Sequence, residues 1–349
     1  MKMLLHTMRL PLKDPFTIAR GTITFQDCLV VELQDQGFVG FGEVTANDFY
    51  GHTLEAMTQA LQSLTEDHLQ QVVDTPPETN WPNLAQQLAG DMFAVSALDM
   101  AAQDLWARKA QQSVWQRWGF EWNSGLHSSF TIGIDTTKEM IRKLNAEPGW
   151  PIYKIKLGTD HDLAIVQSLR EHTDAVFRVD ANCGWTVEQT IENSHQLKDL
   201  GVQYIEQPLP REANPEDKRA IFQQSALPLI ADEDCQRVED LESCFQHFHG
   251  INVKLCKCGG LTPGKQMLEA ARAAGKMTMI GCMVESAIGI SGAAQLAPLL
   301  DFADLDGNNL VRSSPTTGVS VQQGELKNVD GPGTGAKLFV DQLPDYLIR

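Results

Sequence analysis

The segment Tyr153-Lys154-Ile155-Lys156-Leu157-Gly158 places two lysines one residue apart inside an apolar run. On a β-strand, residues i and i+2 point to the same face, so both ammonium groups lie on one side of the strand. A half-exposed strand would turn that side toward solvent, which is the ordinary explanation of such a pair. The charged residues that follow along the chain favour a functional explanation.

These charged residues recur at the ends of short apolar runs, at Asp180, Glu206, Asp232 and Lys254. Counted from Lys156, the gaps are 24, 26, 26 and 22 residues, and each gap holds about one β-strand and one helix. Near-uniform βα repeats predict a parallel sheet, and a series of this length predicts a closed barrel. The predicted strands are 129–134, 152–157, 176–180, 202–206, 229–232, 250–254, 277–281 and a last one ending at 303–306, with helical patterns such as 163–171 and 263–274 between them.

The chain before this series is organised differently. Short strands and turns are predicted over 9–21, a strand over 29–33 and the return arm of a hairpin over 37–43. Helical periodicity begins at Thr53 and is strongest over 93–106. We therefore expect an α+β unit over 1–120, a (β/α) barrel over 121–315, and a loop-like segment over 316–349 that packs back on the first unit.

The composition is that of a large acidic chain. Its 349 residues, 42% of them hydrophobic, are enough for an extensive core and two domains. The net charge of −17 argues against nucleic acid and against anionic membrane surfaces as partners. No apolar run approaches the roughly 18 residues that cross a membrane. The short apolar start, followed by Arg9, is not typical of a signal peptide.

The seven cysteines predict reduced thiols. An odd, scattered set in a chain of this length is not typical of a disulfide framework, which favours a cytoplasmic location. Cys256 and Cys258 have a spacing that could suggest zinc. No second closely spaced Cys or His pair is present to complete four ligands, so we favour a structural role for both.

Three carboxylates are expected to meet at the mouth of the barrel. The carboxyl ends of the strands converge there, and Asp180, Glu206 and Asp232 each close a strand. Three carboxylates in a dry site need a compensating charge, and Mg²⁺ prefers oxygen ligands. Any one acid could instead cap a helix N-terminus. Their common register with Lys156 and Lys254 favours a metal site.

The two lysines predict a proton-transfer reaction. They lie on the second and sixth strands, on either side of the carboxylates, so they would face each other across the metal. One lysine, made neutral by burial and the nearby cation, would remove a proton from a carbon next to a carboxylate. The enediolate that forms would be stabilised by the metal. The opposite lysine could return a proton to the other face, or stabilise charge in an elimination.

These residues resemble the enolase superfamily, and more closely its muconate-lactonising-enzyme subgroup. The resemblance covers nearly the whole chain and implies a modified TIM barrel with an α+β capping domain that the C-terminal tail completes. It is carried by Lys154-Ile155-Lys156, Val179-Asp180-Ala181-Asn182, Ile205-Glu206-Gln207-Pro208, Ala231-Asp232-Glu233 and the run from Asn252 to Leu261.

The resemblance implies a role for each residue. Lys156 and Lys254 form the acid/base pair, and Lys154 polarises the substrate carboxylate. Lys257, three residues past Lys254, is expected to leave the catalytic face. None of the nine histidines falls at a barrel strand end, which disfavours a histidine base of the mandelate-racemase kind. One Mg²⁺ per subunit would be bound by Asp180, Glu206 and Asp232, with Asn182 and Glu233 behind these ligands.

The subgroup contains cycloisomerases, o-succinylbenzoate synthases, N-succinylamino-acid racemases and dipeptide epimerases, and the residues above are common to all. Asp304 and Asp306 distinguish them, because two carboxylates at the mouth suit the free ammonium of a dipeptide. This pair resembles the dipeptide-epimerase signature, of the L-Ala-D/L-Glu epimerase kind. An N-succinyl substrate carries no ammonium and would be repelled. A solvated turn is the alternative explanation.

Other lining residues are expected from the capping loops and from other strand ends. Arg20 lies in what resembles the mobile capping loop and could pair with an acidic side chain such as glutamate, or be a surface arginine on a turn. Tyr50 lies in the second capping loop. Thr131 and Met283 stand at other strand ends and could line the pocket.

The sequence therefore predicts a Mg²⁺-dependent dipeptide epimerase that moves the α-proton next to the C-terminal carboxylate. An N-succinylamino-acid racemase or an o-succinylbenzoate synthase is the alternative within the subgroup. A barrel that binds a metal without catalysis is the alternative of another class. Relatives often form oligomers, so a homo-oligomer is possible.

Overall fold

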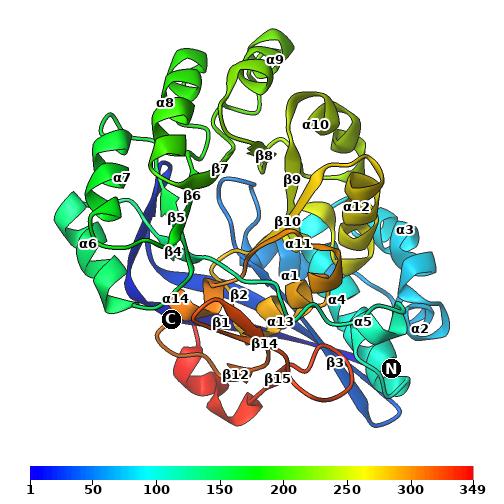
Figure 1. The fold of residues 1–349 in the computed structure, drawn as a ribbon. Helices are drawn as coiled ribbons and strands as arrows, with labels where there is room; N and C mark the ends of the chain where they lie inside the picture. Colours follow the sequence, from blue (N-terminus) through cyan, green and yellow to red (C-terminus); the bar gives the residue numbers. More distant parts are fainter. Residues whose placement is uncertain (349) are drawn as a thin grey trace.

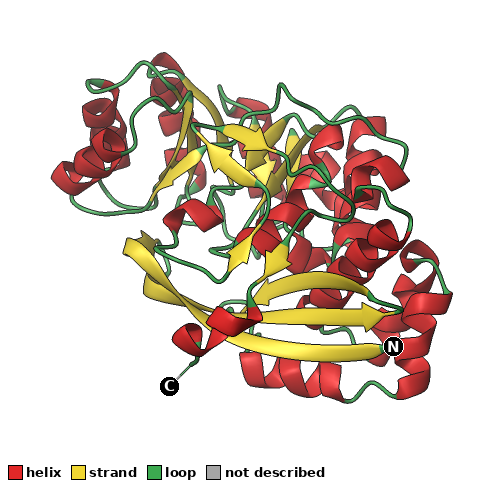
Figure 2. Cartoon of the chain, turned by 90° about the horizontal axis from the view of Figure 1, so that it is seen from below, coloured by secondary structure: helices red, strands yellow, loops and turns green. Residues whose placement is uncertain are grey.

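The computed structural model describes residues 1–348. The chain begins with an antiparallel sheet in the order β1 (Lys2–Ile18), β2 (Gly21–Asp35) and β3 (Phe38–Thr45). Figure 2 shows these three strands as a layer to one side of the barrel. The helices that follow are α1 (Leu54–Gln62), α2 (Glu66–Asp74), α3 (Pro77–Gln87), α4 (Met92–Lys109) and α5 (Val114–Arg117).

Strand β1 is longer than the sequence suggests. The expected short strands and turns over 9–21 form one strand through Ile18, although Pro11 and Pro15 lie within it. Its pairing with β2 shifts register between Pro11 and Phe16, which accommodates Pro15. Proline has no backbone N–H to donate. Because β1 lies at the edge of the sheet, it pairs with a strand on one side only, so a proline there can face the unpaired side.

Helix α4 joins the capping sheet to the barrel, and the helix predicted over 93–106 is confirmed. Gly42 on β3 lies so close to this helix that a Cβ would stand 1.9 Å from the Ala97 carbonyl oxygen. On the barrel side, Asp99 accepts hydrogen bonds from the backbone N–H and hydroxyl of Thr262, at 2.8 and 2.7 Å. The helix is therefore buried on almost every face.

The barrel sheet has eight parallel strands in the sequence order β4 to β11, and a bridge between Ser128 and Ala303 joins its first and last members. The predicted (β/α) barrel with an α+β cap is confirmed. The strands are β4 (Phe130–Ile132), β5 (Ile152–Lys156), β6 (Val176–Asp180), β7 (Val202–Glu206), β8 (Leu229–Ala231), β9 (Gly250–Val253), β10 (Met277–Gly281) and β11 (Phe302–Asp304).

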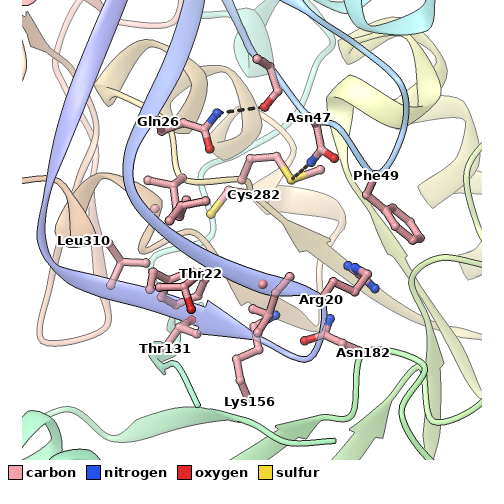
Figure 3. A pocket seen from close by; sticks show the side chains of 18 of the residues that line it. Arg20, Thr22, Gln26, Asn47, Phe49, Thr131, Lys156, Asn182, Cys282 and Leu310 are labelled. Carbon is pink, nitrogen blue, oxygen red and sulfur yellow. Dashed lines mark hydrogen bonds between the residues drawn. The ribbon is translucent and has the colours of Figure 1, made fainter. Parts of the chain in front are cut away.

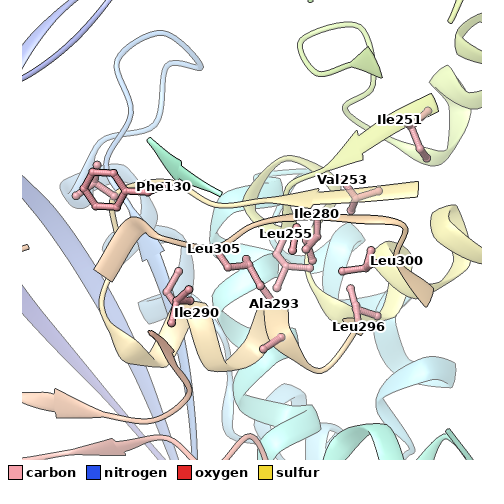
Figure 4. Packing of buried hydrophobic residues seen from close by; sticks show 14 of the residues in the cluster. Phe130, Ile251, Val253, Leu255, Ile280, Ile290, Ala293, Leu296, Leu300 and Leu305 are labelled. Carbon is pink, nitrogen blue, oxygen red and sulfur yellow. The ribbon is translucent and has the colours of Figure 1, made fainter. Parts of the chain in front are cut away.

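Helices surround the barrel strands in Figure 1, as expected of repeated βα units. Apolar side chains of the strands and helices form one large core, part of which Figure 4 shows around Val253, Ile280 and Leu296. No helix within residues 1–348 is long and apolar enough to cross a membrane. The helices are α6 (Thr137–Ala146), α7 (Asp162–Arg170), α8 (Val187–Asp199), α9 (Pro215–Gln224), η1 (Val238–Asp240), α10 (Leu241–His247), α11 (Leu255–Cys258), α12 (Leu261–Ala273), α13 (Ala287–Ala294), η2 (Ala297–Leu299) and α14 (Gly307–Leu310).

The C-terminal segment contains short strands rather than loop alone. Thr334 donates from its backbone N–H to Asp104 of α4 at 2.6 Å, and Arg108 of α4 donates to the Ala336 carbonyl at 2.6 Å. These contacts attach the segment to the capping helix. The domain limits at 120 and 315 stay a prediction. The elements are β12 (Thr316–Thr317), β13 (Ser320–Gln322), β14 (Glu325–Lys327), β15 (Lys337–Leu338) and η3 (Val340–Tyr346).

Candidate active site at the barrel mouth

Three carboxylates meet at the carboxyl ends of neighbouring barrel strands. Asp180 ends β6, Glu206 ends β7, and Asp232 follows β8. Asp180 and Glu206 are register partners across the sheet, so parallel pairing alone brings them together. The three groups offer oxygens that lie within 4.8 Å of one another, and all three side chains are fully buried.

Two lysines flank these carboxylates from β5 and β9. Lys156 Nζ lies 2.6 Å from Asp180 Oδ2, and Lys254 Nζ lies 2.8 Å from Asp232 Oδ2. The strand order places β6, β7 and β8 between them, so the lysines stand on opposite sides of the carboxylates. Both side chains line the same cavity.

Lys154 lies deeper than these two lysines. Its ammonium contacts Asp304 and Glu206, each at 2.7 Å, and Asp180 at 3.2 Å. Burial lowers its pKa, but the three carboxylates raise it well above the ordinary lysine value, so the group stays charged. Lys154 is not one of the cavity-lining residues, and its contact with a substrate carboxylate stays a prediction.

Burial and pairing drive the pKa values of the carboxylates apart. Burial and then the charge of Asp180 raise the pKa of Glu206 to about 7. Burial also acts to raise the pKa of Asp180, but Lys156 and Lys154 more than offset it and hold the value below the ordinary range. The pKa of Asp232 is lowered well below its usual value because Lys254 and Lys257 outweigh burial. Such separation is typical of a functional site.

Asp304 and Asp306 both reach the cavity, but their surroundings differ. Asp304 is paired with Lys154, which lowers its pKa against the effect of burial. Asp306 accepts hydrogen bonds from the backbone N–H and hydroxyl of Thr131, at 2.6 and 3.1 Å. Burial and the neighbouring Asp304 raise the pKa of Asp306 to about 7. Within residues 1–348, Asp306 has no cationic side chain as a partner, so it is the carboxylate open to an incoming cation.

The cavity has a volume of about 500 Å³ and lies between the capping domain and the barrel. Figure 3 shows Arg20 and Phe49 on its capping side, with Lys156 and Asn182 on its barrel side. We call the lining residues within 16–27 and 46–50 the capping wall. The barrel wall consists of Thr131, Lys156, Asn182, Lys254, Cys282, Met283, Val284, Asp304, Asp306, Gly307 and Leu310.

Arg20 crosses from the capping wall to the barrel. Its Nη1 donates to Glu233 Oε1 at 2.7 Å, and its guanidinium lies 4.1 Å from the ring centre of Phe49. The expected position of Glu233 behind Asp232 therefore also makes it the partner of Arg20. Asn182 donates from its backbone N–H to Asp180 Oδ1 at 2.9 Å, and Met283 accepts a long hydrogen bond from Asn47.

The donor set fits a hard divalent cation. Glu206 Oε2 contacts Lys154 without hydrogen-bond geometry and so has no hydrogen-bond partner, although it is buried. The side-chain oxygens of Asn182 and Glu233 Oε2 are also buried without partners. Buried oxygens without donors are costly, and a cation held by Asp180, Glu206 and Asp232 would satisfy Glu206 Oε2.

Comparison with known proteins decides the family. The model of the enolase C-terminal domain-like family matches residues 136–342, and the N-terminal domain model of mandelate racemase and muconate lactonizing enzyme matches residues 2–119. The chain belongs to the enolase superfamily. The resemblance inferred from the strand-end motifs is thereby confirmed.

Individual relatives match nearly the whole chain. An L-Ala-D/L-amino acid epimerase from Flavobacterium johnsoniae is 47% identical over 339 residues, covering 97% of this chain and 100% of the relative. A protein of the same description from a Maribacter species is 42% identical, covering 96% and 98%. The crystal structure of a dipeptide epimerase from Enterococcus faecalis V583, complexed with Mg and L-Leu-L-Tyr, superposes with a TM-score of 0.88 at 30% identity, covering 96% and 99%.

The prediction for Lys257 in this enolase-superfamily chain was wrong. Its ammonium contacts Asp232 twice, at Oδ1 and at the backbone oxygen, each at 2.5 Å. The chain turns into helix α11 directly after Lys254, and on a helix residue i+3 returns to the same side. The prediction treated Lys257 as part of a continuing strand, in which its side chain would point away from the site.

Two further residues support the carboxylates and were not singled out from the sequence. Gln207 Oε1 accepts from the backbone N–H of Asp232 at 3.0 Å, and its own φ of 38° is an uncommon left-handed conformation. Asn252 donates to Glu206 Oε1 at 2.9 Å. Because Asn252 stands two residues before Lys254, strand periodicity could have identified it.

Proposed function

We propose that this enolase-superfamily chain is a Mg²⁺-dependent dipeptide epimerase that inverts the α-carbon next to the C-terminal carboxylate. The observation that carries the proposal is that Lys156 and Lys254 line one cavity and stand on opposite sides of three buried carboxylates. A planar carbanion between two such groups can lose a proton on one face and gain it on the other. The names of the most similar relatives support the same reaction.

Asp180, Glu206 and Asp232 would hold the Mg²⁺. When bound, the ion supplies positive charge that stabilises the developing enediolate of the substrate carboxylate. Lys257 and Asn252 fix the orientations of Asp232 and Glu206, so the ligands are held before the ion arrives.

The lysines of this chain do the proton transfer. Burial lowers the pKa of Lys254, but the charge of Asp232 more than offsets it and holds the pKa well above the ordinary lysine value. That burial together with a bound cation makes one lysine neutral stays a prediction. The lysine that accepts a proton must first be neutral, which requires its carboxylate partner to be engaged elsewhere.

The other end of the substrate is positioned by the eighth strand. Asp306, oriented by Thr131, would accept the ammonium group of the dipeptide, with Asp304 holding Lys154 beneath it. An N-succinyl substrate offers a carboxylate there and would meet like charge. This contrast favours a free dipeptide over the N-acylated substrates of the same subgroup.

A cytoplasmic location is part of the proposal. It is supported by the seven cysteines, which are all free thiols. A homo-oligomer stays a prediction.

Dipeptides incubated with the protein and Mg²⁺ in D₂O, read by mass spectrometry and chiral chromatography, test the function. We expect deuterium at the α-carbon of the C-terminal residue, together with inversion. Faster exchange of N-succinylamino acids would favour the racemase. A complete lack of Mg²⁺-dependent exchange with every substrate would favour a metal-binding scaffold.

A further inference from the structure

The capping wall is unusually apolar for a surface that faces solvent. Of the seven large apolar side chains exposed among residues 1–348, three line this cavity: Ile23 at 37%, Phe25 at 43% and Phe49 at 54%. Phe16 and Ile18 line the same side and are partly exposed. A cluster of exposed apolar side chains at a cavity marks a surface that a ligand covers.

The cations of the cavity are already engaged. Three of the described lining residues are cationic, namely Arg20, Lys156 and Lys254. Their partners are Glu233 at 2.7 Å, Asp180 at 2.6 Å and Asp232 at 2.8 Å, respectively. Asp48, which is exposed, adds a negative charge to the capping wall.

Arg20 is the residue that could receive an acidic side chain, and its geometry opposes this. The Glu233 side chain is 1% exposed, whereas that of Arg20 is 27% exposed. Moving the guanidinium to a substrate carboxylate would leave Glu233 buried with an unpaired charge, which is costly. Arg20 would also lose its position over the Phe49 ring.

We infer that the substrate side chain held against the capping wall is apolar, and that Arg20, held by Glu233, does not receive an acidic one. This inference rests on the proposed function and names the substrate class of the same site. The sequence left two explanations of Arg20 open, and one of them, in which Arg20 receives a glutamate side chain, is the opposite assignment. The ion pair instead fixes Arg20 so that its stem and Phe49 continue the apolar wall.

Three dipeptides of similar shape test the inference: L-Ala-L-Met, L-Ala-L-Gln and L-Ala-L-Glu. We expect kcat/KM to fall in that order, with L-Ala-L-Met exceeding L-Ala-L-Glu by about tenfold or more, equivalent to ~1.4 kcal/mol in transition-state binding. If exchange is fastest with L-Ala-L-Glu, the inference is wrong but the proposed function still stands. If no dipeptide shows exchange, both the proposed function and the inference are wrong.

Two variants test whether Arg20 is held by Glu233 or binds an acidic side chain of the substrate. In Glu233→Gln the guanidinium loses its charged partner, and the rate for L-Ala-L-Glu relative to L-Ala-L-Met should rise roughly three- to fivefold, the size of one partly exposed ion pair. In Arg20→Met the two substrates should change together, within about twofold in kcat/KM. A selective loss of L-Ala-L-Glu turnover in Arg20→Met would overturn the inference.

A matched pair of phenylalanines tests the apolar wall. Phe25→Ser should lower the preference for L-Ala-L-Met over L-Ala-L-Gln by about threefold or more, since exposed apolar area in the cavity is lost. Phe339→Ser is the control, because Phe339 is similarly exposed, at 37%, but lies in the C-terminal segment away from the cavity. Equal preferences in the two variants would contradict the inference. Thermal unfolding followed by circular dichroism checks that both variants are folded.

Discussion

The two walls of the cavity differ in the polarity and the burial of their side chains. The barrel wall presents buried charges, with Lys156 and Lys254 each within 2.8 Å of a carboxylate oxygen. The capping wall presents exposed apolar side chains such as Phe25 and Phe49, and one arginine that is bound to the barrel. In the proposed mechanism, one wall therefore holds and moves protons, whereas the other selects the shape and polarity of the substrate.

The difference follows from how each wall is supported. Strand ends in a parallel sheet are held by ladders of backbone hydrogen bonds, so the barrel charges are preorganised. The capping wall belongs to a hairpin tip and a loop, and it is held by packing through α4 and by the Arg20–Glu233 pair. Changes in the barrel wall should therefore affect rate, and changes in the cap should affect stability and selectivity.

The largest effect is expected for the lysines. Lys156→Ala and Lys254→Ala should each lower kcat for epimerisation by about 10³-fold, the usual range for a lost general acid or base. Each variant should retain slow exchange from one epimer only, because one face keeps its lysine. NMR of α-proton exchange from the L,L and L,D dipeptides in D₂O measures this.

The matched control is Lys265→Ala, since Lys265 pairs with Glu269 on the exposed face of α12. It should leave the rate unchanged. Intact exchange from both epimers in Lys156→Ala would rule out the two-lysine mechanism.

The second prediction concerns the attachment of the cap. In Gly42→Ala the new Cβ would stand 1.9 Å from the Ala97 oxygen, so β3 and α4 must separate. We expect the free energy of unfolding to fall by about 3 kcal/mol, at the upper end for overpacking. Gly125→Ala is the control, because its Cβ would approach only Asn123, at 3.6 Å. Urea unfolding of both variants measures the difference, and equal stabilities would mean that the cap is held in another way.

The third prediction concerns metal binding by Asp180, Glu206 and Asp232. Lys257→Met removes two hydrogen bonds that orient Asp232 but leaves Lys254 in place. Mg²⁺ affinity should fall about 10- to 100-fold, as for other residues that position a metal ligand. Isothermal titration calorimetry reports the affinity without relying on turnover. Unchanged affinity would show that Lys254 and Gln207 suffice to hold Asp232.

The smallest effect, taken per pH unit, is expected for Asp99, which joins α4 to α12. Burial, opposed by hydrogen bonds from Thr262, raises its pKa from 3.8 to about 7 in the folded protein. Between these values the folded state binds the proton and the unfolded state does not. The free energy of unfolding should therefore fall as pH rises from 4 to 7, by about 1.4 kcal/mol per pH unit at most.

Asp99→Asn cannot titrate and keeps one acceptor and one donor for Thr262. Urea unfolding at pH 5, 6 and 7 should show a shallower pH dependence in this variant than in the wild type. An identical slope would assign the pH dependence to other buried carboxylates, such as Glu206 and Asp306.

Sequence periodicity predicted the strand ends well where one type of secondary structure continues along a whole segment. The ends of β6, β7 and β10 at Asp180, Glu206 and Gly281 agree with the predicted ends. Sequence periodicity failed where the local structure changes within a few residues or departs from the usual pattern. Lys257 was misplaced because a strand becomes a helix at that point, and β1 was divided because an edge strand tolerates Pro11 and Pro15.

By itself, the sequence determined the barrel, the cap, and the meeting of three carboxylates and two lysines at one mouth. These follow from a period of two along each strand and one βα unit per repeat, which are local properties. Only the tertiary structure decided the partners of Arg20, Lys154 and Asp306. Each partner lies far away in the chain, and the choice between competing charges depends on distance and burial, which no local pattern encodes.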